Sequence, residues 1–233
     1  MTYRTGTVGS RTAPVGVRRV LFIPLIGALT LVSVLFGLAF VYLSEEVHES
    51  ATLPTDQRVL RRVDDATAAW PVAVAEDVSL LGAEVVVGVV GVVLGGWFLL
   101  RRRVFDALLV IGAVGGYVAL ILLIKPVVAR ERPVPYFRVP EHGYGFPSGH
   151  TMGATCLAFA LGFLLWRSEW RRGVKILGSF ILALAVIVVA MSRLVLGVHY
   201  PTDVLASILL GTAWMSALIA LRCVAERWHA ART

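Results

Sequence analysis

The chain has 233 residues, of which 58% are hydrophobic and only 16% are charged. Its mean hydropathy of +0.79 is too high for a soluble domain of this length, so the composition predicts an integral membrane protein. Lysine and arginine exceed the acidic residues by seven, but no basic stretch alternates with aromatic residues. We therefore expect the bilayer, and not a nucleic acid, to be the partner of this chain.

Six apolar stretches are long enough to cross a bilayer, which takes roughly 20 residues of helix. They cover about residues 20–43, 78–100, 105–124, 151–166, 174–191 and 201–221. The sequence thus predicts an all-α integral membrane bundle of six transmembrane helices. We expect one domain over residues 1–233, with a motif-bearing core at about 105–222.

Basic residues are distributed unevenly among the connections between these spans. Four lie before the first span, three at 101–103, four at 167–175 and three after the last span. Cytoplasmic connections of membrane proteins carry such an excess of lysine and arginine. We therefore expect both termini in the cytoplasm, and segment 44–77 and both motif-bearing connections on the outer face.

Segment 44–77 allows two interpretations. Apolar residues including Leu60 and Val63 recur at helical spacing against charged residues such as Arg61 and Asp64. This pattern predicts a helix lying on the outer surface of the membrane. The alternative is a solvated loop with an accidental periodicity, and in neither case do we assign the segment a role in the site.

Glu84 is expected several residues inside the second span, where a carboxylate is costly unless it is neutral, paired or hydrated. It could line an outward-facing cavity. Alternatively, it could be a neutral or snorkelling acid near the interface.

Three basic residues stand at the outer ends of the later spans. Lys125 ends the third span, Arg132 follows it before a proline, and Arg193 closes the fifth span. One such residue would be explained by snorkelling to lipid head groups. Three on the face where basic residues are disfavoured predict a shared phosphate site, because phosphoryl transfer needs its negative charge neutralised.

The motif Pro147-Ser148-Gly149-His150 directly precedes the fourth apolar run. Ser148 is suited to cap a helix whose first N–H groups bind an anion, and Gly149 would allow backbone and ligand to approach closely. His150 is then expected at the first turn beside the bound group. Taken alone, the motif would indicate no more than a capped helix followed by an ordinary histidine.

His199 and Asp203 are four residues apart, at the start of the sixth span. The carboxylate could hold one ring nitrogen and leave the other free to attack phosphorus, or the pair could merely cap the helix. Two histidines and an aspartate would also suit a metal. We expect no metal and no cofactor, because three neighbouring cations would repel a metal ion and already supply its charge.

In order and spacing these motifs resemble the three-part signature of the type 2 phosphatidic acid phosphatase superfamily, in its six-helix membrane branch. The resemblance covers about 125–203 and implies metal-independent hydrolysis through a phosphohistidine. It implies that His199 is the nucleophile, that Asp203 orients it, and that His150 donates a proton to the leaving oxygen. The implied phosphate-binding residues are Lys125, Arg132, Ser148, Gly149 and Arg193.

These expectations together predict a multi-pass phosphatase of a bacterial cell (inner) membrane whose site faces the periplasm or the exterior. Its substrate would be a membrane lipid phosphate, with undecaprenyl diphosphate favoured over phosphatidylglycerol phosphate and phosphatidate. The alternatives are a lipid phosphotransferase using the same intermediate and a non-catalytic lipid-phosphate binder or transporter. The sequence does not indicate an oligomeric state.

Overall fold

A computed structural model describes residues 15–232 except Trp70, and side chains from Ile23 onward apart from Trp70 and Pro135. All regular elements in this part of the chain are helices, as expected. The α-helices are α1 (Val15–His48), α2 (Leu53–Thr67), α3 (Val72–Ser79), α4 (Glu84–Leu100), α5 (Val104–Val128), α6 (Gly149–Arg167), α7 (Arg172–Val195) and α8 (Pro201–Ala230), with short 3-10 turns η1 (Leu80–Gly82) and η2 (Val134–Tyr136).

Six helical segments of this structure are long and apolar enough to span a membrane. They are Ile23–His48, Val72–Leu100, Val104–Val128, Gly149–Arg167, Arg172–Val195 and Pro201–Ala230. The prediction of six transmembrane helices is thus confirmed, although the first and sixth spans end later than predicted and the second begins earlier.

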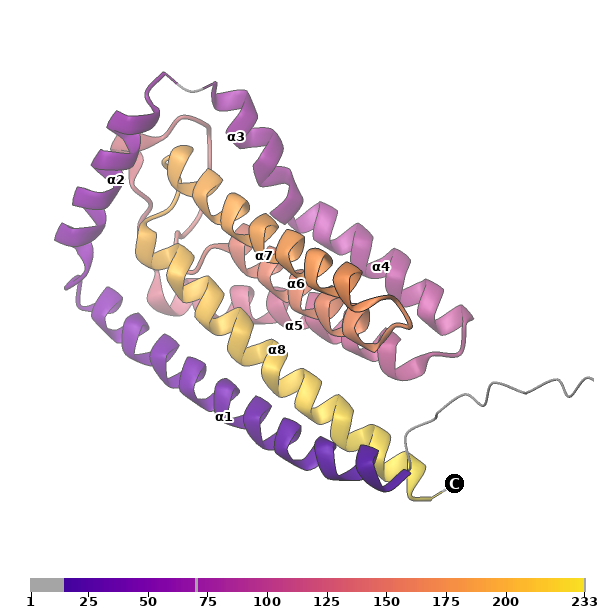
Figure 1. Cartoon of the computed structure of the whole chain (residues 1–233). Coiled ribbons are helices and arrows are strands. Elements are labelled where there is room, and N and C mark those ends of the chain that lie inside the picture. Colours follow the sequence, from indigo (N-terminus) through magenta and orange to yellow (C-terminus); the bar gives the residue numbers. More distant parts are fainter. Residues whose placement is uncertain (1–14, 70, 233) are drawn as a thin grey trace, which may run out of the picture.

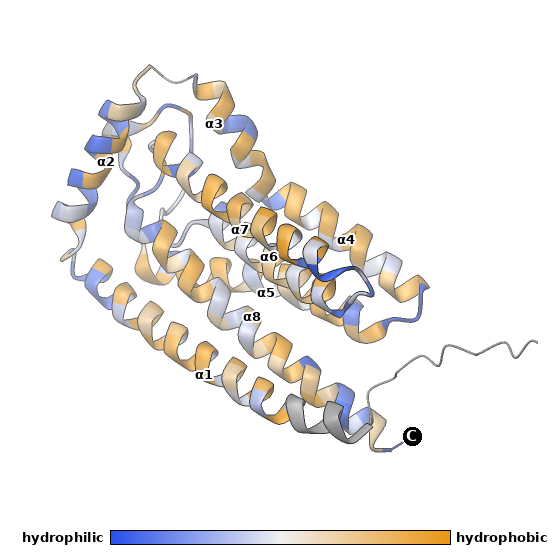
Figure 2. Ribbon diagram, viewed as in Figure 1, coloured by the Kyte–Doolittle hydropathy of each residue, from blue (hydrophilic) through white to orange (hydrophobic). Residues whose placement is uncertain are grey.

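The centre of the bundle is formed by α5, α6 and α8, and α1 lies alongside α8 over much of its length (Figure 1). Tyr117 of α5, Met152 of α6 and Met215 of α8 are fully buried in one apolar cluster. Helix α1, in contrast, exposes large apolar side chains such as Leu31, which is 58% exposed. Such a surface is suited to lipid, and hydrophobic residues dominate α1, α4 and α7 in Figure 2.

The second span is interrupted about a third of the way along its length. Ala83 has an extended backbone with φ −60° and ψ 138°, so the helix stops at η1 and begins again at Glu84. Glu84 therefore occupies the first turn of α4, where the helix dipole favours a negative charge. The sequence placed it several residues inside a continuous helix, and the break explains how its carboxylate is tolerated.

Segment 44–77 is largely helical and does not form an extended outer loop. Helix α1 continues to His48, and α2 crosses the end of the bundle (Figure 1). The apolar side of α2 packs through Leu60 and Val63 against the ends of α7 and α8, including Leu194. The amphipathic helix is thus present, but its apolar face packs on protein, since the ends of α7 and α8 offer apolar surface there.

Candidate active site

The three sequence motifs meet at the end of the bundle that α2 covers. Lys125 lies in the last turn of α5 and Arg193 in the last turn of α7. His150 lies in the first turn of α6 and Asp203 in the first turn of α8. Alternating helix directions therefore bring residues up to 78 positions apart to one layer, as the motif interpretation required.

The turn between α7 and α8 depends on Gly197. Its φ is +68°, and a Cβ on this residue would lie 1.7 Å from the carbonyl oxygen of Tyr136. Both the left-handed backbone and the close approach require glycine. This turn carries His199 into the layer of the other motif residues.

A cavity of about 380 Å³ opens among these elements. Five of the eight predicted site residues line it, together with five residues that were not assigned a role. The lining consists of Lys125, Arg132, Gly149, His150 and His199, and of Ala83, Glu84, Val85, Glu141 and His142. Glu84 is thus on the cavity wall, which agrees with the first of its two interpretations.

The ring of His199 is held between a cation and a carboxylate. Arg132 Nη1 lies 3.2 Å from His199 Nε2, and Asp203 Oδ2 lies 3.5 Å from His199 Nδ1. A guanidinium is a donor without acceptor capacity, so Nε2 must present its lone pair. The proton of the neutral ring then resides on Nδ1, on the side of Asp203.

Burial affects how readily this ring takes a second proton. His199 is 1% exposed, and burial lowers the pKa of its imidazole to about 4. The Asp203 carboxylate raises the pKa of His199, whereas the charges of Arg132 and Arg193 lower it further. The ring is therefore neutral at ordinary pH, with the lone pair of Nε2 toward Arg132.

Asp203 is completely buried and makes several contacts besides that with His199. Its Oδ2 accepts a hydrogen bond from the Tyr200 backbone N–H at 2.8 Å, and its Oδ1 accepts one from Arg130 Nη1 at 2.6 Å. The first of these closes a capping box at the start of α8. Asp203 thus caps its helix, and its Oδ2 also faces His199 Nδ1 at 3.5 Å, without a hydrogen bond between them.

Arg132 and Arg193 share one carboxylate. Glu141 Oε1 lies 3.4 Å from Arg132 Nη2, and Glu141 Oε2 lies 3.1 Å from Arg193 Nη2. Burial would raise the pKa of Glu141, but the two guanidinium groups hold it below its ordinary value. The two arginines therefore share one anionic partner, which is a side chain of the protein itself.

Both arginines are fixed by further hydrogen bonds. Arg132 donates to the carbonyl oxygens of Val198 and Gly143, each at 2.9 Å, and Arg193 donates to Ser79 Oγ at 2.7 Å. Each of these guanidinium groups is nearly buried. Their charges are thus oriented before any ligand arrives, which is the arrangement that electrostatic stabilisation requires.

The start of α6 agrees only in part with the sequence interpretation. Ser148 occupies the N-cap position, but its hydroxyl accepts a hydrogen bond from Thr151 Oγ1 at 3.1 Å and makes no capping bond. It is fully buried and does not line the cavity. At Gly149, an added Cβ would lie 3.1 Å from Glu84 Oε1, so the glycine allows a side chain of the protein to approach the backbone closely.

Sequence reasoning did not identify Glu141, Arg130 or Asp56. Arg130 bridges Asp203 and Asp56 of α2, so α2 is connected to the site although we had assigned it no role. Glu141 lies in a loop of irregular structure, where periodicity gives no indication of what a side chain contacts. Asp56 was visible only as an acidic residue in the first turn of an amphipathic helix.

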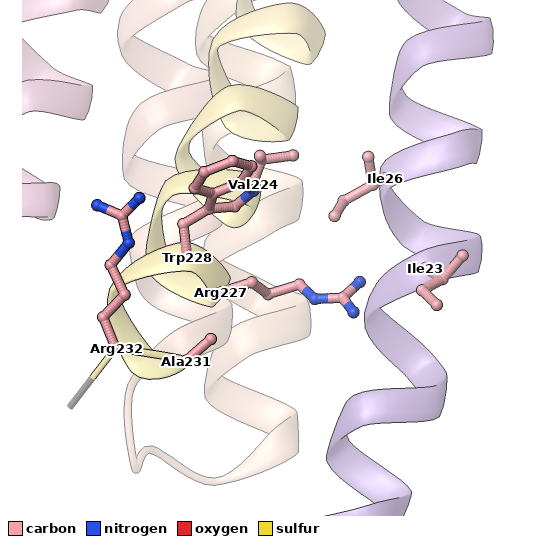
Figure 3. Close-up of a pocket in the computed structure, with 7 residues that line it drawn as sticks. All are labelled: Ile23, Ile26, Val224, Arg227, Trp228, Ala231 and Arg232. Atoms are coloured by element: carbon pink, nitrogen blue, oxygen red, sulfur yellow. The ribbon is translucent and has the colours of Figure 1, made fainter.

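A second cavity, of about 520 Å³, lies between α1 and the last turns of α8 (Figure 3). It contains none of the predicted site residues. Its lining of Ile23, Trp228 and two arginines is typical of the zone where a membrane helix meets the head groups.

Comparison with known proteins identifies the family. Residues 103–228 match the family model described as PAP2 superfamily. The chain belongs to the PAP2 superfamily. The match contains all the motif residues brought together here and confirms the resemblance drawn from them.

Two curated relatives are informative. Phosphatidylglycerophosphatase B of Bacillus subtilis (strain 168) is 29% identical over 179 residues, which cover 75% of this chain and 86% of the relative. A putative undecaprenyl-diphosphatase of Escherichia coli (strain K12) is 46% identical over 66 residues, or 28% of this chain and 29% of the relative.

The fold also resembles a solved structure. A crystal structure of a transmembrane PAP2 type phosphatidylglycerolphosphate phosphatase from Bacillus subtilis matches with a TM-score of 0.74 and 27% sequence identity. The match covers 81% of this chain and 94% of that one. The chain is therefore a multi-pass membrane lipid phosphate phosphatase of the PAP2 type, and the predicted enzyme class is confirmed.

Proposed function

We propose that this phosphatase removes phosphate from a membrane lipid through a phosphohistidine formed at His199 Nε2. The observation that carries the proposal is the contact of Arg132 with Nε2, since it requires that nitrogen to be unprotonated, and both residues line the cavity. Asp203, on the other side of the ring, would stabilise the positive charge that develops on attack. The 3.5 Å separation of Asp203 Oδ2 and Nδ1 would shorten as the imidazolium forms.

In the first half-reaction, Nε2 attacks phosphorus, and the bond from phosphorus to the leaving oxygen breaks. His150, on the same cavity wall, donates a proton to that oxygen. Lys125, Arg132 and Arg193 balance the charge of the phosphoryl oxygens. To bind there, the phosphate must displace the Glu141 carboxylate from between the two arginines.

In the second half-reaction, the now neutral His150 takes a proton from water as the oxygen of that water attacks the phosphohistidine. The bond from phosphorus to Nε2 breaks, and inorganic phosphate leaves. Among the proposed phosphate-binding residues, Ser148 is the one whose hydroxyl is bonded inside the protein, to Thr151. That bond would have to break before the Ser148 hydroxyl could reach the phosphate.

We propose that the site faces the periplasm or the exterior and that both termini are cytoplasmic. Clusters of arginine and lysine at 101–103 and 167–175 lie at the connections α4–α5 and α6–α7, at the opposite end of the spans from the α7–α8 connection (Figure 1). The positive-inside bias supports this orientation.

Two lipids stand out as substrates to assay. The longer match, to a phosphatidylglycerophosphatase, supports phosphatidylglycerol phosphate. The shorter match at higher identity, to a putative undecaprenyl-diphosphatase, supports undecaprenyl diphosphate, which the sequence analysis favoured. We propose both, with phosphatidylglycerol phosphate now placed first because its relative is matched over most of its length.

Purified protein in detergent, assayed for phosphate release against these two lipids, phosphatidate and lipid A phosphates, tests the proposal. Brief incubation with a ³²P-labelled substrate, followed by alkaline denaturation, should trap an acid-labile label on the wild type and none on His199→Ala. Label passed to a lipid or sugar instead of water would indicate a transferase. Binding without any turnover would indicate a non-catalytic binder and contradict the proposal.

A further inference from the structure

The resemblance described above gives Arg130 no role, and Arg130 does not line the cavity around His199. Its guanidinium is nevertheless hydrogen-bonded to Asp203. Arg130 Nη1 donates to Asp203 Oδ1 at 2.6 Å and Nη2 donates to Asp56 Oδ2 at 2.6 Å. The arginine side chain is 9% exposed, and the two carboxylates are 0% and 2% exposed. One buried cation therefore joins an outer helix to the carboxylate beside the histidine.

Asp56 is itself anchored to the start of α8. Its Oδ1 accepts a hydrogen bond from the Thr202 backbone N–H at 3.1 Å, and its Oδ2 accepts one from Thr202 Oγ1 at 2.5 Å. Arg130 also donates to Thr202 Oγ1 at 2.6 Å, and its guanidinium lies 4.4 Å from the centre of the Tyr200 ring. Arg130 and Asp56 are thus bonded to each other, and both are bonded to Thr202 at the start of α8.

This network fixes the rotation of the Asp203 carboxylate. Arg130 holds Oδ1, so Oδ2 must point to the Tyr200 N–H and to the ring of His199. A buried carboxylate that loses its cation either turns toward another donor or becomes protonated, since an unpaired buried charge is costly. In both cases the negatively charged Oδ2 would no longer face His199 Nδ1.

We propose that Arg130 and Asp56 are positioning residues that hold the Asp203 carboxylate toward His199, so that α2 takes part in catalysis. They act through Asp203 and touch neither the phosphate nor the nucleophile. This inference rests on the proposed function, in which His199 attacks and Asp203 orients it.

A second ion pair between the same loop and α2 provides a matched control. Arg138 Nη2 lies 2.7 Å from Asp64 Oδ1 and donates to the Asp64 backbone as well. This pair also attaches the loop to α2, but neither member contacts Asp203. Arg138→Gln should therefore remove an attachment of similar kind and leave the orientation of Asp203 intact.

The experiment measures kcat, KM and the inhibition constant of orthovanadate for Arg130→Gln and Arg138→Gln. Arg130→Gln should lower kcat by roughly 10- to 100-fold, because a small misplacement of a reacting group has effects of this size. KM and the vanadate constant should change less than about threefold, since the phosphate-binding cations are untouched. Arg138→Gln should keep kcat within about twofold of the wild type.

Two further comparisons keep the inference testable if Arg130→Gln does not fold. Arg130→Lys should recover part of the rate, and Asp56→Asn should lower kcat severalfold more than Asp64→Asn. Equal loss of kcat in the Arg130 and Arg138 variants, or in the two aspartate variants, would overturn the inference. So would a loss that appears in KM alone.

Labelling separates this inference from the proposed function. If wild-type protein forms the labelled histidine and Arg130→Gln forms it at the same rate, the positioning role is wrong while the mechanism stands. If the wild type turns over substrate without labelling at His199, the proposed function itself is wrong.

Discussion

Glu141 provides a sharp test of the phosphate-binding position. Its carboxylate bridges Arg132 and Arg193 and is 27% exposed, so substrate phosphate has to compete with it. Ion pairs of this partly exposed kind contribute up to about 1 kcal/mol each. Removing both should improve phosphate binding by about 1–2 kcal/mol, which corresponds to roughly 5- to 30-fold in affinity.

The perturbation is Glu141→Gln, which keeps the shape of the side chain and removes its charge. We expect the inhibition constants of inorganic phosphate and orthovanadate to fall by roughly 5- to 30-fold in protein purified in detergent. Glu131→Gln, on the same loop but lining a different cavity, is the control and should leave both constants within about twofold. Unchanged or weaker inhibition in Glu141→Gln would show that the carboxylate holds the arginines in place and does not compete with phosphate.

Three other predictions concern the chemistry. Arg193→Ala should lower kcat/KM by roughly 10²-fold, as for other preorganised charge stabilisers; a loss of less than severalfold in a rate assay would remove its proposed role. Because burial lowers the pKa of His199 to about 4 in the ligand-free protein and the neutral ring attacks, kcat/KM should fall as pH drops through about 4, whereas a midpoint near 6.5 would contradict this assignment. Chelators should not change the rate; loss of phosphate release that added metal restores would support the metal alternative.

The spans and motif residues could be predicted because their signals are local. A helix that crosses a bilayer needs a long apolar run, and such runs are visible without knowledge of any neighbour. Lysine, arginine and histidine at the ends of spans could likewise be recognised from their residue type. The only further information needed was which span ends lie on the same side of the membrane. The single-domain organisation, the outward orientation of the site and the catalytic and binding roles of the motif residues stay predictions.

The interruption at Ala83 was not predicted, because residues 72–100 read as apolar helix on both sides of it. The position of α2 was not predicted either. Its amphipathic pattern indicates that one face of the helix packs against an apolar environment, but both a bilayer and an apolar protein surface can provide that environment. Only the packed ends of α7 and α8 decide between them.

The sequence by itself determined six apolar spans, their short connections and the inventory of cations, histidines and an aspartate at one end of them. Only the tertiary structure decided that Arg132 faces His199 Nε2, that Glu141 fills the space between two arginines, and that Arg130 joins Asp203 to α2. The reason is physical: hydropathy is a property of each segment, whereas the pairing of buried charges depends on which distant side chains the packing brings within hydrogen-bond distance.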